Sequence, residues 1–346
     1  DGFSRIRHTY DPRGNRVETG YLGADEKPSY NRDGYCNARF EHDAFGRTVR
    51  ESYLGPEGGP AIHRLGYASL VRVFNKRGQV EREEYFGADA KPTLCAEGYF
   101  RFVREYDVLG NETRSQAFGT DEKPIVTVKG YASMRQAYDD RGYPVSLAFF
   151  DAEDEPTFDV NGLARVAFVN DALGRVIDES YFGTDGEPVV DVNGIARRTQ
   201  QFDARGRVTE DSYFGANDLP VMVRGGAATT RYTFDEAALT TVIEFFGPSN
   251  QSVRLPSGAS RIVQRYGVRG ELREEQFYGL DDRPVVTDAG YAHLVREYDA
   301  RGNVTRELFL DAYDRPYAAR GYSAVLNNYD EQNNTVLTAH LGPRGE

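Results

Sequence analysis

The chain has 346 residues, long enough for two ordinary domains, and its formal net charge is −12. This acidic balance disfavours nucleic acid as a partner, because phosphate binding depends on clustered Lys and Arg. No apolar run reaches the roughly 18 residues that span a bilayer, so we expect no membrane insertion.

An internal repeat organises the whole sequence. A Gly recurs every 32 residues, and once after 31, at Gly2, Gly34, Gly66, Gly98, Gly130, Gly162, Gly194, Gly226, Gly258, Gly290 and Gly321. Further Gly and Pro series keep the same spacing, and the unit reads approximately G-Y-A-x-L-V-R-x-Y-D-x-R-G-N-V-x-R-E-x-Y-F-G-x-D-x-x-P-V. We therefore expect eleven units in a single array over residues 1–346, without separate domains, each unit starting near one of these Gly.

Each unit opens with a predicted strand that leads into a turn. Small, aliphatic and aromatic residues alternate along this strand, as in Ala68, Leu70 and Phe74, and period two places them on one face. The turn that follows, Tyr298–Asn303 in one copy, begins with Asp and closes with Gly three residues later. This is type I turn chemistry, with a Gly that can adopt the positive φ of a following bulge. Gly267 is the exception at the opening position.

A second strand and a second turn complete the unit. The apolar residues of this strand stand two and eight positions after the turn Gly, as in Val80 and Phe86. In the second turn, residues 183–188 in one copy, Gly provides a left-handed residue and Pro begins the next extended segment. Gly and Pro interrupt every window of about 12 residues, which disfavours helix. No unit could bury its apolar face alone, so the units must stack.

Two stacking geometries are possible, a parallel β-solenoid and a series of antiparallel hairpins. Glu51 and Glu83 share one repeat position, so a parallel stack would place them directly over each other. Like charges opposite each other are destabilising, whereas hairpins interpose another strand. The predicted fold is therefore all-β: an elongated repeat protein of eleven 32-residue β-hairpin units in a wound antiparallel sheet, similar to a β-solenoid.

Two motifs resemble known repeat families. The run Y-D-x-x-G-N, at Tyr10–Asn15, Tyr106–Asn111 and Tyr298–Asn303, resembles the YD repeat of the RHS family, whose long β-sheets wind into shells or surface structures in bacteria. The run Y-F-G-x-D-x-x-P, at Tyr85–Pro92 and Tyr181–Pro188, is similar to the aromatic element of cell-wall and glucan-binding repeats. Those are β-hairpin solenoids whose aromatic side chains hold choline or sugars. The resemblance implies a bacterial surface or secreted protein with a protein or polysaccharide partner.

The inventory of catalytic residues is thin. The sequence contains no nucleophile, phosphate-loop or zinc-protease motif, and its five His are scattered over different repeat positions. Adjacent acids such as Glu83 and Glu84 point to opposite faces of a strand, so they cannot form a glycosidase pair. Cys36 and Cys95 are too few for a disulfide framework or a zinc site. We expect no catalytic residue, no metal site and no enzyme activity.

Calcium at the acidic turns is left open. Asp and Glu recur there, as in Asp25-Glu26 and Asp281-Asp282, and a turn can add carbonyl oxygens to these carboxylates. Asp also favours turns for purely local backbone reasons. We therefore expect no cofactor, with calcium at the acidic turns as the alternative.

A column of aromatic residues is the candidate binding site. The Tyr after the repeat Gly has the parity opposite to the apolar face, so we expect it to be exposed and to bind a ligand, at Tyr35, Tyr67, Tyr99, Tyr131, Tyr291 and Tyr322. Such a column could stack on sugar rings or hold a protein strand. The alternative is that each Tyr covers the turn beside it.

These observations predict a non-enzymatic repeat segment of a larger bacterial surface or secreted protein, which acts outside the cell or at its surface as scaffold, spacer or adhesive module. One alternative is a carbohydrate-binding module of the glucan-repeat kind, and another is an RHS-like shell segment of a toxin system. Neither end carries a distinct polar cap, so head-to-tail self-association through the terminal strands is also expected.

One unit, residues 226–257, is irregular. It has Ala238 in place of the turn Gly, Ser249 in place of the acidic turn residue and Ser252 in place of the Pro. This pattern reflects either drift or a weak joint in the array, since the stability of repeat arrays is a sum of local and nearest-neighbour terms.

Overall fold

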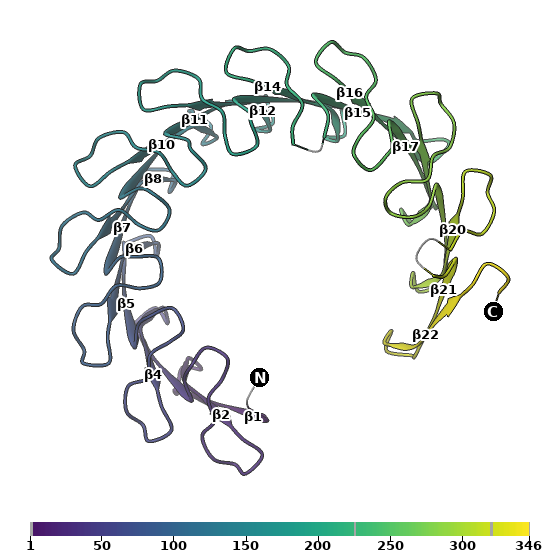
Figure 1. Cartoon of the computed structure of the whole chain (residues 1–346). Coiled ribbons are helices and arrows are strands. Elements are labelled where there is room, and N and C mark those ends of the chain that lie inside the picture. The colour runs from purple at the N-terminus through teal and green to yellow at the C-terminus, as the bar shows by residue number, and fades with distance from the viewer. Residues whose placement is uncertain (1–2, 225, 319–320, 346) are drawn as a thin grey trace. The chain divides into compact units, whose positions relative to one another are not determined.

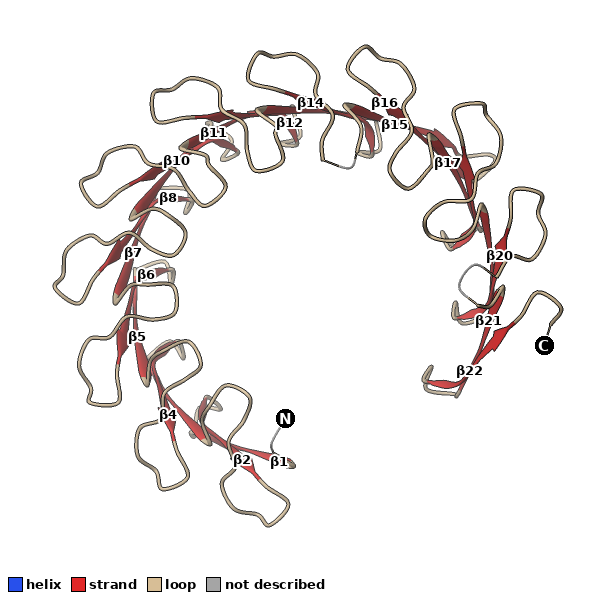
Figure 2. Cartoon of the chain, in the orientation of Figure 1, coloured by secondary structure: helices blue, strands red, loops and turns tan. Residues whose placement is uncertain are grey.

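A computed structural model describes residues 3–224, 226–318 and 321–345, and Gly2, the first Gly of the repeat series, lies outside them. These residues contain 22 strands, and no helix is present among them (Figure 2). The described residues accordingly offer no helix that could cross a membrane. The predicted all-β array of hairpins is confirmed.

The strands come in pairs, and each pair forms one hairpin of 18 residues inside a repeat unit. Their bounds are β1 (Arg5–Tyr10), β2 (Arg16–Leu22), β3 (Asn37–His42), β4 (Thr48–Leu54), β5 (Ser69–Phe74), β6 (Val80–Phe86), β7 (Arg101–Tyr106), β8 (Glu112–Phe118), β9 (Ser133–Tyr138), β10 (Pro144–Phe150), β11 (Arg165–Asn170), β12 (Val176–Phe182), β13 (Arg197–Phe202), β14 (Val208–Phe214), β15 (Thr229–Asp235), β16 (Thr240–Phe246), β17 (Arg261–Tyr266), β18 (Leu272–Tyr278), β19 (His293–Tyr298), β20 (Val304–Leu310), β21 (Ala324–Tyr329) and β22 (Thr335–Leu341).

Tertiary contacts group the chain into two compact units. The first comprises Asp1–Gly174 and Tyr181–Glu187, and the second comprises Arg175–Ser180 and Pro188–Glu346. The first holds the strands from β1 to β11, coloured purple to teal in Figure 1, and the second holds those from β13 to β22, coloured green to yellow. The expected single array over residues 1–346 stays a prediction.

Within each compact unit, strands that follow one another along the chain pair antiparallel, both inside a hairpin and between hairpins. In the β5/β6 hairpin, Arg72 lies opposite Glu83, and β4 pairs with β5 so that Glu51 lies opposite Leu70. The strand that carries Arg72 therefore separates Glu51 from Glu83. The antiparallel array predicted over the parallel solenoid is confirmed, and the interposed strand supplies a positive charge as well as distance.

The hairpin turns have the geometry that their Asp and Gly predict. In β5/β6 the register shifts by one residue between Val73 and Phe74, and Gly78 has a φ of 85°. A bulge of this kind needs a left-handed residue, which Gly adopts without steric cost. The β15/β16 hairpin of the irregular unit differs, because Asp235 pairs directly with Thr240 and no register shift occurs.

The connection between hairpins contains one turn more than the sequence predicts. Gly87 and Lys91 close the expected turn with a backbone hydrogen bond, from the amide of Gly87 to the carbonyl of Lys91, of 2.9 Å. A further turn follows, in which the amide of Gly98 donates to the carbonyl of Cys95 at 2.9 Å. The amide of Ala96 in this turn donates to the carbonyl of Leu65 in the preceding unit at 2.7 Å. The further turns of consecutive units are thus linked through their backbones.

Candidate functional site

Within each compact unit, the hairpin turns lie at the same end of the strands, and in most hairpins a side chain fills the gap to the next turn. The residue after the turn Gly performs this role. The Arg47 guanidinium donates to the carbonyl of Asn75 at 3.5 Å, and the side-chain amide of Gln79 donates to the carbonyl of Gly110 at 2.7 Å. In the second compact unit, the side-chain amide of Asn303 donates to Oδ1 of Asn333 at 3.0 Å. Neighbouring turns therefore contact each other through this position.

The β17/β18 hairpin departs from this arrangement. Its residue after the turn Gly is Glu271, whose carboxylate folds back over its own turn and accepts hydrogen bonds from the Arg269 amide at 3.1 Å and from Nη2 of Arg273 at 2.8 Å. The space it fills is left free by Gly267, because a Cβ added there would overlap the Glu271 carboxylate. Glu271 thus satisfies the turn amide that Asp satisfies in other hairpins, and it does not reach the next turn.

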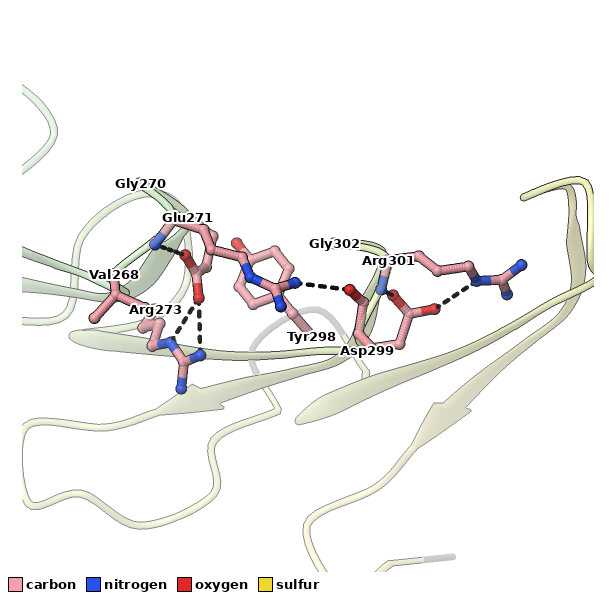
Figure 3. A pocket seen from close by; sticks show the side chains of 10 residues that line it. Val268, Gly270, Glu271, Arg273, Tyr298, Asp299, Arg301 and Gly302 are labelled. Carbon is pink, nitrogen blue, oxygen red and sulfur yellow. Dashed lines mark hydrogen bonds and ion pairs between the residues drawn. The ribbon is translucent and has the colours of Figure 1, made fainter.

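The gap that Glu271 leaves is a cavity of about 650 Å³ between the β17/β18 turn and the β19/β20 turn, crossed by Arg269, whose Nη1 donates to the carbonyl of Ala300. Figure 3 shows Tyr298 between the two turns, with Glu271 and Arg273 on one side and Asp299 and Arg301 on the other. The cavity therefore lies wholly within the second compact unit.

Each of the two carboxylates in the cavity wall accepts three hydrogen bonds. Asp299 accepts from the Arg301 and Asn303 amides through Oδ1, each at 2.9 Å, and from the Asn303 side chain through Oδ2 at 2.9 Å. These bonds, first that of the Asn303 side chain, lower the pKa of Asp299. The hydrogen bond from Arg273 is the main cause that lowers the pKa of Glu271. Both groups are therefore anionic at neutral pH and already partnered.

A second cavity, of about 380 Å³, adjoins the first on the side of the irregular unit. Phe234, Glu236 and Tyr266 contribute to its wall. Arg207 lies over the Phe234 ring, with 3.9 Å between its Cζ and the ring centroid, and its Nη1 lies 2.6 Å from Oε1 of Glu236. Sequence reasoning missed both cavities. The available signal was Gly267 itself, an exception whose partner, Glu271, stands four residues further on.

The predicted binding tyrosines are less exposed than expected. Tyr35 is 9% exposed and Tyr67 is 6% exposed, so the expectation of exposure is wrong for both. The other four, Tyr99, Tyr131, Tyr291 and Tyr322, are half-buried. The physical reason is that this position precedes the strand. Tyr67 stands two residues before β5, in the connection, where the period-two rule does not hold. Their role in ligand binding stays a prediction.

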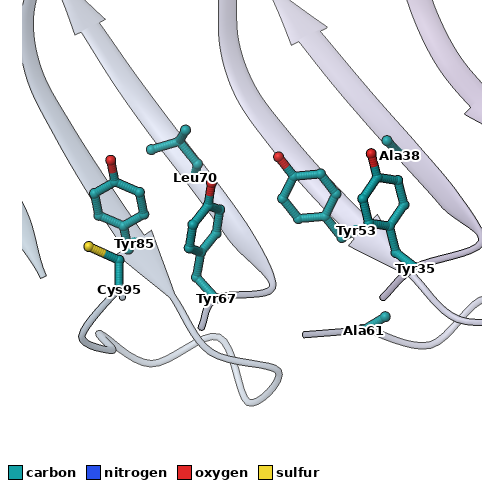
Figure 4. Packing of buried hydrophobic residues seen from close by; sticks show 8 residues of the cluster. All are labelled: Tyr35, Ala38, Tyr53, Ala61, Tyr67, Leu70, Tyr85 and Cys95. Carbon is teal, nitrogen blue, oxygen red and sulfur yellow. The ribbon is translucent and has the colours of Figure 1, made fainter. Parts of the chain in front are cut away.

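In the first compact unit these tyrosines belong to a row of aromatic rings. Figure 4 shows the rings of Tyr35, Tyr53, Tyr67 and Tyr85 side by side. Their consecutive centroids are 4.7, 5.8 and 4.8 Å apart, and Tyr99 continues the row at 5.7 Å from Tyr85. Burial is the main cause that raises the pKa of both Tyr35 and Tyr99 to about 12. Each ring in the row links one hairpin to the next.

The second compact unit has a shorter row of aromatic rings. Tyr291 lies between Phe277 and Phe309, with centroid distances of 5.7 and 5.2 Å. Phe309 also contacts Tyr322 at 5.9 Å. The Tyr position therefore packs against the second strand of each neighbouring hairpin in both units.

Charged side chains of the first unit form a ladder beside the aromatic row. Arg72 pairs with Glu51 in the preceding hairpin and, through Nε, with Oε1 of Glu83 at 3.0 Å. Arg104 of the next hairpin pairs with Oε2 of the same Glu83 at 2.9 Å. The ladder also contacts the aromatic row, because the Tyr53 hydroxyl donates to Oε2 of Glu51 at 2.9 Å. The glutamates that share one repeat position are thus joined through arginines.

The acidic turns use their carboxylates locally. Oδ1 of Asp25 accepts from the Lys27 amide at 3.1 Å, and Glu26 pairs with Arg5. Asp282 pairs with Arg261 at 2.5 Å. Over residues 3–224, 226–318 and 321–345, no three His, Cys, Asp or Glu side chains gather in a way that could hold a metal ion. Calcium binding stays a prediction, as does the expected lack of cofactors and of enzyme activity.

No protein family model matches the chain, and no curated protein matches it. Among solved structures, a crystal structure of TcdB2-TccC3-TEV matches 97% of this chain at 12% identity with a TM-score of 0.31. A TcdB2-TccC3 structure without the hypervariable C-terminal region matches 97% at 10% identity with a TM-score of 0.31. The Tc holotoxin pore of Photorhabdus luminescens matches 98% at 10% identity with a TM-score of 0.24. The chain spans 20%, 18% and 22% of these three chains, about a fifth of their length.

Proposed function

We propose that the chain is a non-enzymatic structural segment of a larger protein, in which consecutive hairpins form a wall or spacer. The observation that supports this role is the row of aromatic rings from Tyr35 to Tyr99, because every second contact in it, Tyr53 with Tyr67 and Tyr85 with Tyr99, joins neighbouring hairpins. An isolated two-stranded hairpin is marginal in water, so such contacts are what an array of hairpins needs. The side chains that sequence reasoning assigned to a ligand are thus employed between the units.

The chemistry of the aromatic row agrees with a structural role. Burial raises the pKa of Tyr35 and of Tyr99 to about 12, so neither phenol serves as a base near neutral pH. The arginines and glutamates beside the row pair with each other in the ladder of Glu51, Arg72 and Glu83.

Among structural segments, an RHS-type shell wall is the form that we favour. The Y-D-x-x-G motif that carries this resemblance forms the hairpin turns. In one copy, Oδ1 of Asp107 accepts from the amides of Leu109 and Asn111, both at 2.8 Å. A motif that fixes the turn of each hairpin also fixes its register, which a long regular sheet requires.

Binding of neutral glucans tests the proposal against the carbohydrate-binding alternative. We expect the chain to bind none on a glucan array, and Tyr67→Leu and Tyr291→Leu to act on stability alone. A neutral glucan that binds the wild type and is released by either variant, while circular dichroism shows a folded chain, would replace the structural role with a carbohydrate-binding one.

A further inference from the structure

We infer that the cavity between the β17/β18 and β19/β20 turns binds an oxyanion, a phosphate or carboxylate group carried on a small sugar-like molecule. This ligand site goes beyond the structural role proposed above, which does not depend on it. It rests on the open gap beside Glu271 and on the unpaired donors around that gap.

The cavity is a built feature of this hairpin. The β9/β10 hairpin of the first unit provides the contrast, because there Tyr143 follows the turn Gly. Its ring lies so close to Gly174 of the next turn that a Cβ added to this Gly would overlap it. Glu271 holds the same repeat position and is fixed over its own turn by Arg269 and Arg273. The gap at Glu271 is therefore kept open by hydrogen bonds.

Unused hydrogen-bond donors define the class of ligand. Arg269 donates only through Nη1, to the carbonyl of Ala300 at 2.7 Å, and a guanidinium has five N–H donors. Arg301 donates through Nη1 to the carbonyl of Asp330 at 2.7 Å, and its Nε lies 3.6 Å from Asp299. The two carboxylates in the wall already accept three hydrogen bonds each. The polar capacity that remains is cationic and donating, and guanidinium groups pair with phosphate and carboxylate.

Size and shape indicate more than a bare ion. A cavity of about 650 Å³ falls in the range of small-molecule sites and exceeds what a phosphate fills. Tyr298 lines the cavity, and its hydroxyl is held by the carbonyl of Leu272 at 2.7 Å. A fixed ring of this kind offers an apolar surface to a sugar ring. An acidic or phosphorylated monosaccharide matches both the donors and the volume.

Four probes separate these contributions when each is titrated into the whole chain by calorimetry. Glucose 6-phosphate and glucuronate carry the oxyanion on a sugar, inorganic phosphate carries it alone, and glucose lacks it. We expect a Kd of about 1 mM or below for one of the two acidic sugars, weaker binding of phosphate and no binding of glucose. Lack of binding by both acidic sugars, or equal binding of glucose, would overturn the inference.

Arginine variants locate the site. Arg269→Gln is expected to weaken binding of the acidic sugar at least tenfold. Arg141→Gln is the matched control, since Arg141 has the same repeat position and also donates to the next turn, to the carbonyl of Asp171 at 3.2 Å, but borders a filled gap. It should leave the Kd unchanged. Equal effects of the two variants would show that binding lies elsewhere.

A final variant closes the cavity. Gly267→Asp with Glu271→Asn restores the turn residues of the neighbouring hairpin, so that the Asn side chain can reach the next turn. We expect this double variant to fold and to lose binding of the acidic sugar. Retained binding in a folded double variant would contradict the assignment of the site to this gap.

Discussion

Glu271 occupies the space that Gly267 leaves empty. A Cβ added to Gly267 would overlap the Glu271 carboxylate. This carboxylate accepts the hydrogen bond from the backbone amide of Arg269 that an Asp at position 267 would otherwise accept. In the next hairpin, Oδ1 of Asp299 accepts the corresponding Arg301 amide at 2.9 Å. The two departures from the repeat thus compensate each other, and the same turn amide is satisfied from a residue four positions later.

This compensation predicts strong coupling between the two positions. Gly267→Asp alone should lower the Tm, because it places a second carboxylate against Glu271. Glu271→Asn alone should also lower it by a few degrees, because the turn amide loses its acceptor. The double variant should return close to the wild-type Tm. Thermal unfolding of the four proteins forms a double-mutant cycle, and additive effects would contradict the compensation.

Tyr67 is predicted to stabilise the array rather than to serve at an exposed surface. Tyr67→Ala removes a ring that contacts Tyr53 and Tyr85, and we expect a loss of about 3 kcal/mol in the free energy of unfolding. Urea titration followed by circular dichroism measures it. Tyr30→Ala is the control, since Tyr30 is 53% exposed, and its effect should be small. Comparable losses in both variants would contradict a structural role specific to the row.

Arg72 is predicted to stabilise the charged ladder. Arg72→Met keeps most of the side-chain stem but leaves Glu51 and Glu83 without this shared partner, and we expect a loss of about 2 kcal/mol in urea. Adding Glu83→Gln should recover part of this loss. The exposed pair of Arg5 and Glu26 provides the comparison, because Arg5→Met should cost less than about 1 kcal/mol. Equal losses for Arg72 and Arg5 would show that the ladder adds nothing.

His63 is predicted to make the stability of the first unit depend on pH. Its ring stacks between Tyr35 and Tyr67, and its Nδ1 lies 3.1 Å from the Leu65 amide, which donates to it. Burial is the main cause that lowers the pKa of His63. A lowered pKa means that the folded chain binds the proton less well than the unfolded chain. This contribution is therefore complete above the unfolded pKa of about 6.5 and is lost as the pH falls below it.

The Asn at the same position one repeat earlier supplies the control for this prediction. Oδ1 of Asn31 accepts the Asp33 amide at 2.9 Å, so His63→Asn should keep the turn without a titrating ring. Asp33, Glu51 and Arg64 are the charged groups that act on His63, and all three remain in the variant. Between pH 7.5 and 5, urea unfolding should show a smaller loss of stability for His63→Asn than for the wild type. Identical pH profiles would exclude His63 as the cause.

The parts of the fold that the sequence predicts are those with a local origin. Asp followed by Gly three residues later predicts the hairpin turn and its bulge, and alternation predicts strands such as β5 and β6. The further turn between hairpins escaped prediction because its opening residue changes from unit to unit. It is His63 in one unit and Cys95 in the next, so no single residue type marks this position in all units.

The site shows the same limit. The burial of Tyr67 depends on that further turn. The alternation of side chains along a strand does not predict the exposure of a residue in the connection before the strand. The cavity beside Glu271 depends on a side chain that fails to cross to the next turn. Gly267 is visible in the sequence as an exception, but its consequence arises only from the contact with Glu271 in three dimensions.

The irregular unit is predicted to be the least protected hairpin of the second compact unit. Cavities adjoin it on two sides, one lined by Phe234 and Thr240 and the other by Val242 and Ser252. Amide hydrogen exchange across residues 236–258 should therefore be faster than across 204–226, the same stretch one repeat earlier. Equal protection of the two stretches would refute a weak joint.

The turn of this hairpin offers a way to strengthen it. Because Ala238 stands in place of Gly and the bulge is missing, Leu239 takes the left-handed conformation, with a φ of 51°. A side chain there costs about 1 kcal/mol, which Gly avoids. Leu239→Gly should therefore slow amide exchange in β15 and β16 several-fold. Leu173→Gly is the control, since Leu173 is an exposed hairpin-turn residue without a positive φ, and it should leave exchange unchanged or faster. Faster exchange in Leu239→Gly would show that the packing of this side chain outweighs the backbone strain.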